Sequence, residues 1–128
     1  MRSVSLYVMA LFYFVAGIIH FVKPGYYMQI MPSWIPLGAH LTLVYLSGLA
    51  ESALGAALVV PALRRRAAWG IIALLVAVFP ANVHMWLHDV HPDGVALPSW
   101  FHAVRLPLQA VLIAWAYWHT RPAPSAAR

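Results

Sequence analysis

The chain has 128 residues, 63% hydrophobic and only 9% charged, whereas a soluble domain carries about 25% charged residues, so an ordinary water-soluble fold is excluded. The net charge of +5 does not indicate nucleic-acid binding, because three of the eight Lys and Arg residues are adjacent at 64–66 and no basic helix face is present. The absence of cysteine excludes disulfides, thiol redox chemistry and thiolate metal ligands.

Four apolar segments predict four transmembrane helices, at residues 4–22, 41–60, 67–87 and 100–119. The first carries no formal charge, is long enough to cross a bilayer, and is too long for the apolar region of a signal peptide. Residues 23–40 combine prolines with aromatic residues at helical spacing, which predicts either a short amphipathic helix in the headgroup region or a plain loop. Pro80 interrupts the third segment, and Pro107 lies in the fourth.

The short connections between these segments predict one all-α membrane domain over residues 1–120, an antiparallel four-transmembrane-helix bundle. Residues 121–128 contain two prolines and small residues, which predicts a disordered cytoplasmic tail. Lys23 and Arg105 fall on one side of the predicted membrane. The other side carries Arg2, Arg64, Arg65, Arg66, Arg121 and Arg128, so both termini are predicted to be cytoplasmic.

Glu51 lies near the middle of the second segment, where a carboxylate costs a few kcal/mol and is normally paired, neutral or functional. Its helix face is small and polar, which predicts a close approach by a neighbouring helix and directs Glu51 into the bundle. That face consists of Ser47, Gly48, Glu51, Ser52 and Gly55. Glu51 is therefore either a functional group or a neutral acid that only ties helices together.

Polar residues from all four segments predict one pocket around Glu51. Arg105 starts about 20 Å further out along the bundle axis by the helical rise, so His20 and Gln109 are expected nearest to Glu51. Arg105 is either part of the pocket or a headgroup anchor. Pro80 removes the amide that would bond the Val76 carbonyl, which leaves an acceptor for Asn82, water or a ligand. The candidate pocket residues are Glu51, His20, Gln109, Asn82, Arg105 and Ser47.

Three histidines near the end of the third segment, His84, His88 and His91, follow an i, i+4, i+7 pattern that can bind a metal. They lie at a helix end near water, where histidine is ordinary. The sequence therefore predicts no metal site, with these three histidines as the alternative, and gives haem even less support.

Four short motifs cover nearly the whole chain: Ala16-Gly17-x-x-His20-Phe21-x-x-Pro24-x-x-Tyr27, Ser47-Gly48-x-x-Glu51 with Gly55, Pro80-Ala81-Asn82, and Arg105-Leu106-Pro107-Leu108-Gln109. Together they resemble the DoxX-like family of small bacterial membrane proteins, in its short branch. The resemblance implies a four-helix, multi-pass protein of the bacterial inner membrane. The family takes its name from a subunit of a thiosulfate:quinone oxidoreductase, and it brings no catalytic residues to this chain.

Two functions stay open at this point. The first is a quinone- or lipophile-binding subunit of a membrane oxidoreductase, with quinone as its cofactor and a membrane or cytoplasmic redox protein as its partner. The second is a non-enzymatic scaffold, assembly factor or small transporter in the lipid bilayer, with a homo-oligomer as a further option. No prosthetic-group motif is present, so no covalently bound cofactor and no self-sufficient catalysis are expected.

Overall fold

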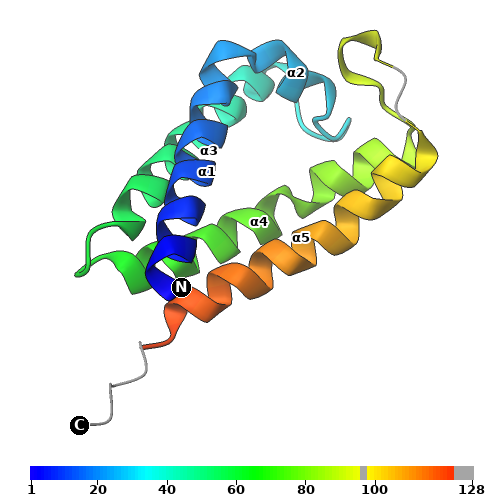
Figure 1. The fold of residues 1–128 in the computed structure, drawn as a ribbon. Helices are drawn as coiled ribbons and strands as arrows, with labels where there is room; N and C mark the ends of the chain where they lie inside the picture. Colours follow the sequence, from blue (N-terminus) through cyan, green and yellow to red (C-terminus); the bar gives the residue numbers. More distant parts are fainter. Residues whose placement is uncertain (96–97, 123–128) are drawn as a thin grey trace, which may run out of the picture.

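The computed structural model describes residues 1–95 and 98–122 (Figure 1). In chain order the elements are α1 (Arg2–Val22), α2 (Pro24–Gln29), α3 (Leu37–Leu58), α4 (Arg64–Leu87), the short 3-10 helix η1 (Pro92–Gly94) and α5 (Ser99–Thr120). The described residues contain no strand, which confirms the all-α prediction. Of the predicted disordered tail, residues 123–128 lie outside the described part of the chain.

Three of the described helices, α1, α3 and α4, are long and apolar enough to cross a membrane. This finding supports the prediction of a membrane protein. The 22 residues of α5 span about 33 Å at 1.5 Å per residue, which is also sufficient length. Its polar residues make it less apolar than the other three, so a fourth crossing stays a prediction.

Two helices, α3 and α4, begin more than two residues earlier than the apolar runs indicate. α3 starts at Leu37, directly after Pro36, whose fixed φ of −56° and extended ψ of 135° suit the residue that precedes a helix. α4 starts at Arg64, so the arginine triplet forms its first turn instead of a loop. The segment after α1, for which the sequence allows either a short helix or a loop, forms the short helix α2 with Pro24 in its first turn.

The long helices form two antiparallel pairs, α1 with α3 and α4 with α5, and contacts between α3 and α4 join the pairs (Figure 1). The pairs meet at the end where α1 begins and α5 ends, and they diverge toward α2 and η1. At the open end the side chain of Gln29 donates a 3.0 Å hydrogen bond to Asp93, so α2 and η1 connect the two pairs. The molecule is therefore V-shaped, with its opening bridged by short segments.

Small residues allow α1 and α3 to approach very closely. A Cβ atom added at Gly55 would lie 2.6 Å from the backbone nitrogen of Phe14, and one added at Gly48 would lie 2.8 Å from the carbonyl oxygen of Gly17. The Ser52 hydroxyl donates a 3.1 Å hydrogen bond to the Phe14 carbonyl. The small polar face of α3 thus packs against the backbone of α1, as interfaces between membrane helices often do.

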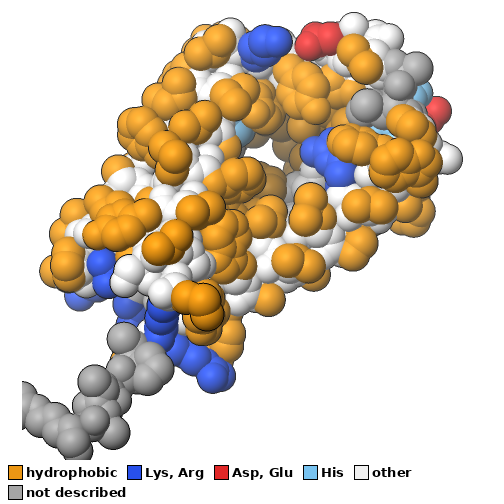
Figure 2. All heavy atoms as spheres, viewed as in Figure 1, with side chains coloured by type: hydrophobic (Ala, Val, Ile, Leu, Met, Phe, Trp, Pro, Cys, Tyr) orange, Lys and Arg blue, Asp and Glu red, His pale blue; other side chains and the backbone are white. Residues whose placement is uncertain are grey.

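The closed end of the V holds the hydrophobic core, where all four long helices meet. Polar contacts add to it: Arg2 donates to the carbonyls of Trp118 and Pro122, at 2.9 Å each, and Ser5 Oγ lies 3.1 Å from His119 Nε2. Lys and Arg side chains gather at this end (Figure 2). The buried core residues are Leu6, Met9, Ala10, Tyr13, Leu58, Ala67, Ala68, Ile71, Leu75 and Ala116.

Candidate functional site

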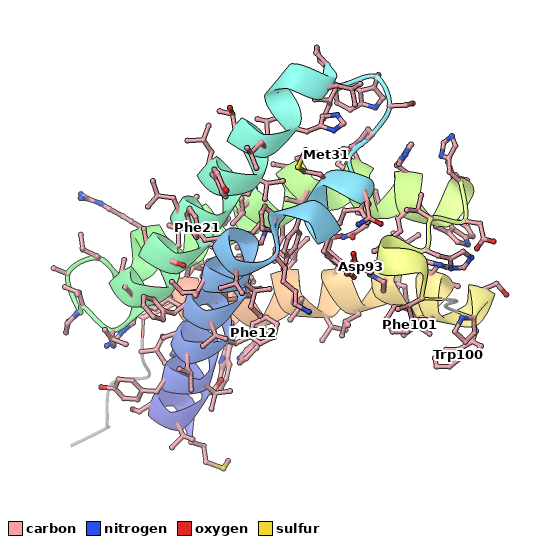
Figure 3. The ribbon with its side chains drawn as sticks, turned by 90° about the horizontal axis from the view of Figure 1, so that it is seen from above. Phe12, Phe21, Met31, Asp93, Trp100 and Phe101 are labelled. Carbon is pink, nitrogen blue, oxygen red and sulfur yellow. The ribbon has the colours of Figure 1, made fainter. Side chains whose placement is uncertain are left out.

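A cavity of about 230 Å³ lies between the two helix pairs, on the open side of the core. The space-filling view shows the surface hollowed between the pairs (Figure 2). Side chains from α1, α2, α3, α4 and α5 line it, and most of them are apolar. Met31, on the segment after α2, contributes to the lining (Figure 3). The polar side chains that face the cavity are those of Tyr13, His20, Tyr27, Ser47, Glu51, Asn82 and Arg105.

The neighbours of His20 hold its ring in one orientation. Its Nδ1 lies 2.9 Å from the Ala16 carbonyl oxygen and 3.4 Å from Glu51 Oε2. Because a carbonyl only accepts, Nδ1 carries the hydrogen, and Nε2 of a neutral ring is then an acceptor. The Tyr27 ring stacks on the imidazole at 3.8 Å between centroids and 12° between planes. Tyr27 of α2 thus holds the ring of His20, a residue of α1, in place.

Burial raises the pKa of the Tyr27 phenol above its ordinary value. The hydroxyl of Tyr27 therefore stays protonated at neutral pH. It adds a hydrogen-bond donor from α2 to the lining of the cavity.

On the opposite wall, a hydrogen-bonded chain holds Arg105 at the cavity. Arg105 donates to Asn82 Oδ1 at 3.2 Å, and Asn82 Nδ2 donates to Gln109 Oε1 at 2.7 Å. Gln109, which is 4% exposed, in turn donates to the Leu75 carbonyl. Each amide in this chain is both donor and acceptor, so its orientation is fixed and Arg105 is held where its charge faces the cavity.

Five of the six predicted pocket residues line this one cavity: Glu51, His20, Asn82, Arg105 and Ser47. Gln109 lies behind the cavity wall and orients Asn82. Arg105 shares the cavity with Glu51, although the depth count placed it about 20 Å further out by the helical rise. The hydrogen bond to Asn82 holds Arg105 in the cavity lining, so this side chain is part of the pocket and not only a headgroup anchor.

Gln109 also contacts the backbone of α4 near Pro80. It donates a hydrogen bond to the carbonyl of Leu75, a residue that is 8% exposed. The acceptor that Pro80 leaves without its helical amide is the Val76 carbonyl, one residue further along the chain. The Asn82 side chain donates to Gln109, and a partner for the Val76 carbonyl stays a prediction.

Two tyrosines of the site were not among the predicted pocket residues. Tyr13 is 2% exposed, and its buried hydroxyl has no hydrogen-bond partner within the described ranges. A signal existed, because Tyr13 precedes His20 by seven residues and so shares its helix face. Tyr27 could only be recognised as an interfacial aromatic residue, since its contact with His20 depends on how α2 folds back.

The three histidines proposed as a metal alternative do not come together. The rings of His84 and His88 lie 4.2 Å apart on α4. α4 ends at Leu87, so His91 does not continue their helix face, and its Nε2 lies 3.3 Å from Asp89 Oδ2 instead. An i, i+4, i+7 pattern needs an unbroken helix, and this helix stops before its third member.

Residues 9–120 match a family that is described as a domain of unknown function, DUF8561. The matched range includes all of α2, α3, α4 and α5 and most of α1. No curated protein and no solved structure matches the chain.

Proposed function

Since the chain belongs to the DUF8561 family, whose description names no activity, we propose its function from the cavity. The protein binds the ring of a lipophilic carbonyl compound, such as a quinone, as a subunit of a membrane oxidoreductase. One observation carries this proposal: an acid, an imidazole and a guanidinium, from Glu51, His20 and Arg105, face one largely apolar cavity. An apolar cavity with a few convergent polar groups is the usual form of a small-molecule site.

The size of the cavity favours a ring over a larger ligand. At about 230 Å³ it is smaller than typical ligand pockets, which measure about 300–1,000 Å³. A single substituted ring fits such a space, and a long apolar tail would extend out between the helix pairs toward lipid. The resemblance to the DoxX-like family, with its link to a quinone oxidoreductase, points to the same class of ligand.

The polar groups suit a carbonyl that gains electrons and protons. As a neutral acid, Glu51 donates a hydrogen bond to a carbonyl oxygen and supplies a proton when a partner protein reduces the ring. Arg105 provides positive charge for oxygen that becomes anionic during the reduction. The electrons come from the partner, so this chain binds and positions the ring, and the membrane or cytoplasmic redox protein carries out the electron transfer.

The cavity itself is tested by filling it. Ala81 lines the cavity, whereas Ala77, one turn earlier on α4, is exposed and does not line it. We expect protein purified in mild detergent to carry a quinone detectable by mass spectrometry of the extracted lipids. Ala81→Phe should remove most of this quinone and Ala77→Phe should retain it. Equal retention by the two variants would contradict the proposal, and a co-purifying protein without quinone would favour a scaffold or assembly factor.

We also propose that α5 crosses the bilayer with the other three helices, with both termini in the cytoplasm of a bacterial inner membrane. The support is the charge distribution: Arg2, Arg64 and Arg121 surround one pocket at the closed end of the V. The chain's three carboxylate side chains, Glu51, Asp89 and Asp93, belong to other parts of the fold. Positive residues concentrate on the cytoplasmic side of membrane proteins.

Cysteine labelling tests this orientation without background, because the chain contains no native cysteine. Ala62 is exposed in the connection between α3 and α4, and Ser99 is exposed at the start of α5. With an impermeant thiol reagent on intact cells, Ser99→Cys should be labelled, and Ala62→Cys should be labelled only after permeabilisation. The reverse pattern would show the opposite orientation.

A further inference from the structure

A cluster of metal-binding side chains lies apart from the cavity, where α4 ends and α5 begins. Asp89, His91 and His102 each offer one ligand atom, and these atoms all lie within 4.8 Å of one another. We propose that Asp89, His91 and His102 bind a divalent transition-metal ion of the zinc class. Asp93 and Phe101, labelled in Figure 3, mark the same end of the molecule.

The distances within the cluster are close to those of a metal site. His91 Nε2 lies 3.3 Å from Asp89 Oδ2, and His102 Nε2 lies 3.9 Å from Asp89 Oδ1. Zinc bonds to nitrogen and oxygen measure about 2.0–2.2 Å, which separates neighbouring ligand atoms of a tetrahedron by roughly 3.3–3.6 Å. The first pair has this spacing, and the second pair, at 3.9 Å, is slightly wider.

His102 supplies a second, independent observation. Its side chain is 1% exposed, and neither ring nitrogen has a hydrogen-bond partner in the part of the chain that the structure describes. A buried polar group without a partner is unfavourable and calls for an explanation, and a bound ion is one of the standard ones. A metal bonded to Nε2 would satisfy the nitrogen that is directed at Asp89.

The end of α4 explains how Asp89 reaches this position. The Val90 amide donates to the Met85 carbonyl at 3.0 Å, and the Asp89 amide contacts the Trp86 carbonyl at 3.4 Å, which together form a Schellman motif. Asp89 occupies its left-handed position with φ of 47°, where glycine is the usual residue. The turn thus brings a carboxylate to the start of α5.

The donor set selects the class of ion. Two imidazoles and one carboxylate suit zinc and its neighbours among the transition metals, whereas calcium and magnesium prefer oxygen ligands alone. Three protein ligands leave a fourth position for water. The Asp89 side chain is 71% exposed, so a metal ion can reach the cluster directly from solution.

The test uses the full-length protein in mild detergent, purified with a histidine-free tag and treated with a chelator. Titration with zinc chloride in a calorimeter should show one equivalent bound, and cobalt chloride should produce the visible absorption of a tetrahedral cobalt site. Zinc should also raise the thermal unfolding midpoint, because a ligand that binds the folded state stabilises it.

Asp89→Gly removes the carboxylate and leaves the left-handed turn with its preferred residue, so lost binding is not a folding defect. We expect this variant to bind zinc more than about tenfold more weakly, since even outer-shell partners of metal ligands contribute about 10–100-fold. His88→Ala removes an exposed imidazole one residue away and should leave binding unchanged. Absence of stoichiometric zinc binding, wild-type affinity in Asp89→Gly, or an equal loss in His88→Ala would overturn the proposal.

Discussion

Gly55→Leu should destabilise the protein by about 3 kcal/mol or more, at or above the upper end of the usual cost of overpacking. A Cβ atom at this position would lie 2.6 Å from the Phe14 backbone nitrogen and 2.8 Å from the Ala10 carbonyl oxygen. Backbone atoms cannot rotate aside as a side chain can, so α1 and α3 must separate. The separation would also break the hydrogen bond from Ser52 to Phe14.

Circular dichroism during thermal unfolding in mild detergent measures this effect as a lowered midpoint. Gly38→Leu is the matched control, because Gly38 lies on the same helix and a Cβ atom there would meet nothing within 4 Å. Its midpoint should stay the same or rise, since leucine favours helix more than glycine does. Equal midpoints for the two variants would show that the close α1–α3 contact does not limit stability.

Glu51→Ala should weaken the binding of a short-tailed quinone by about tenfold or more, whereas Glu51→Gln should bind nearly as well as the wild type. The alanine variant loses a hydrogen bond worth about 1–2 kcal/mol and leaves the His20 imidazole without its acidic neighbour. Glutamine keeps a donor and an acceptor of similar size. Equilibrium titration of the purified protein with the quinone measures both affinities.

Asp93→Asn is the control for this series, because Asp93 is an acid outside the cavity and asparagine can still accept the hydrogen bond from Gln29. It should leave quinone affinity unchanged. Infrared difference spectroscopy should show a carboxylic C=O band in the wild type that both Glu51 variants lack. Wild-type affinity in Glu51→Ala, or a Glu51 that is already ionised at pH 7, would contradict its role as a hydrogen-bond donor.

The parts of the fold and site that follow helical periodicity could be predicted from the sequence. The small face of α3 and the inward position of Glu51 follow directly from 3.6 residues per turn, and the structure places Gly48 and Gly55 against α1. His20 lies beside Glu51 for the same reason, since both are on the facing sides of these two helices. The helical repeat therefore also predicts which faces of these two long helices pack against each other.

Features that depend on how separate segments meet could not be predicted. The stacking of Tyr27 on His20 requires α2 to fold back toward α1, and helical periodicity does not predict this change of chain direction. The position of Arg105 depends on its hydrogen bond to Asn82 of the neighbouring helix, which a count of residues along one axis omits. The approach of His102 to Asp89 depends on the Schellman motif, where helical spacing ends.

Each of the two helix pairs is continuous in the sequence, and this order matters during synthesis. α1, α2 and α3 are complete before α4 leaves the ribosome, and N-terminal units generally fold first. His20 and Glu51 both belong to this first half, so the acid has its imidazole neighbour in the membrane before Asn82 and Arg105 exist. Because an acidic side chain without a partner is costly in a bilayer, we expect the contact between His20 and Glu51 to lower the free-energy cost of inserting α3 before the second half of the site is made.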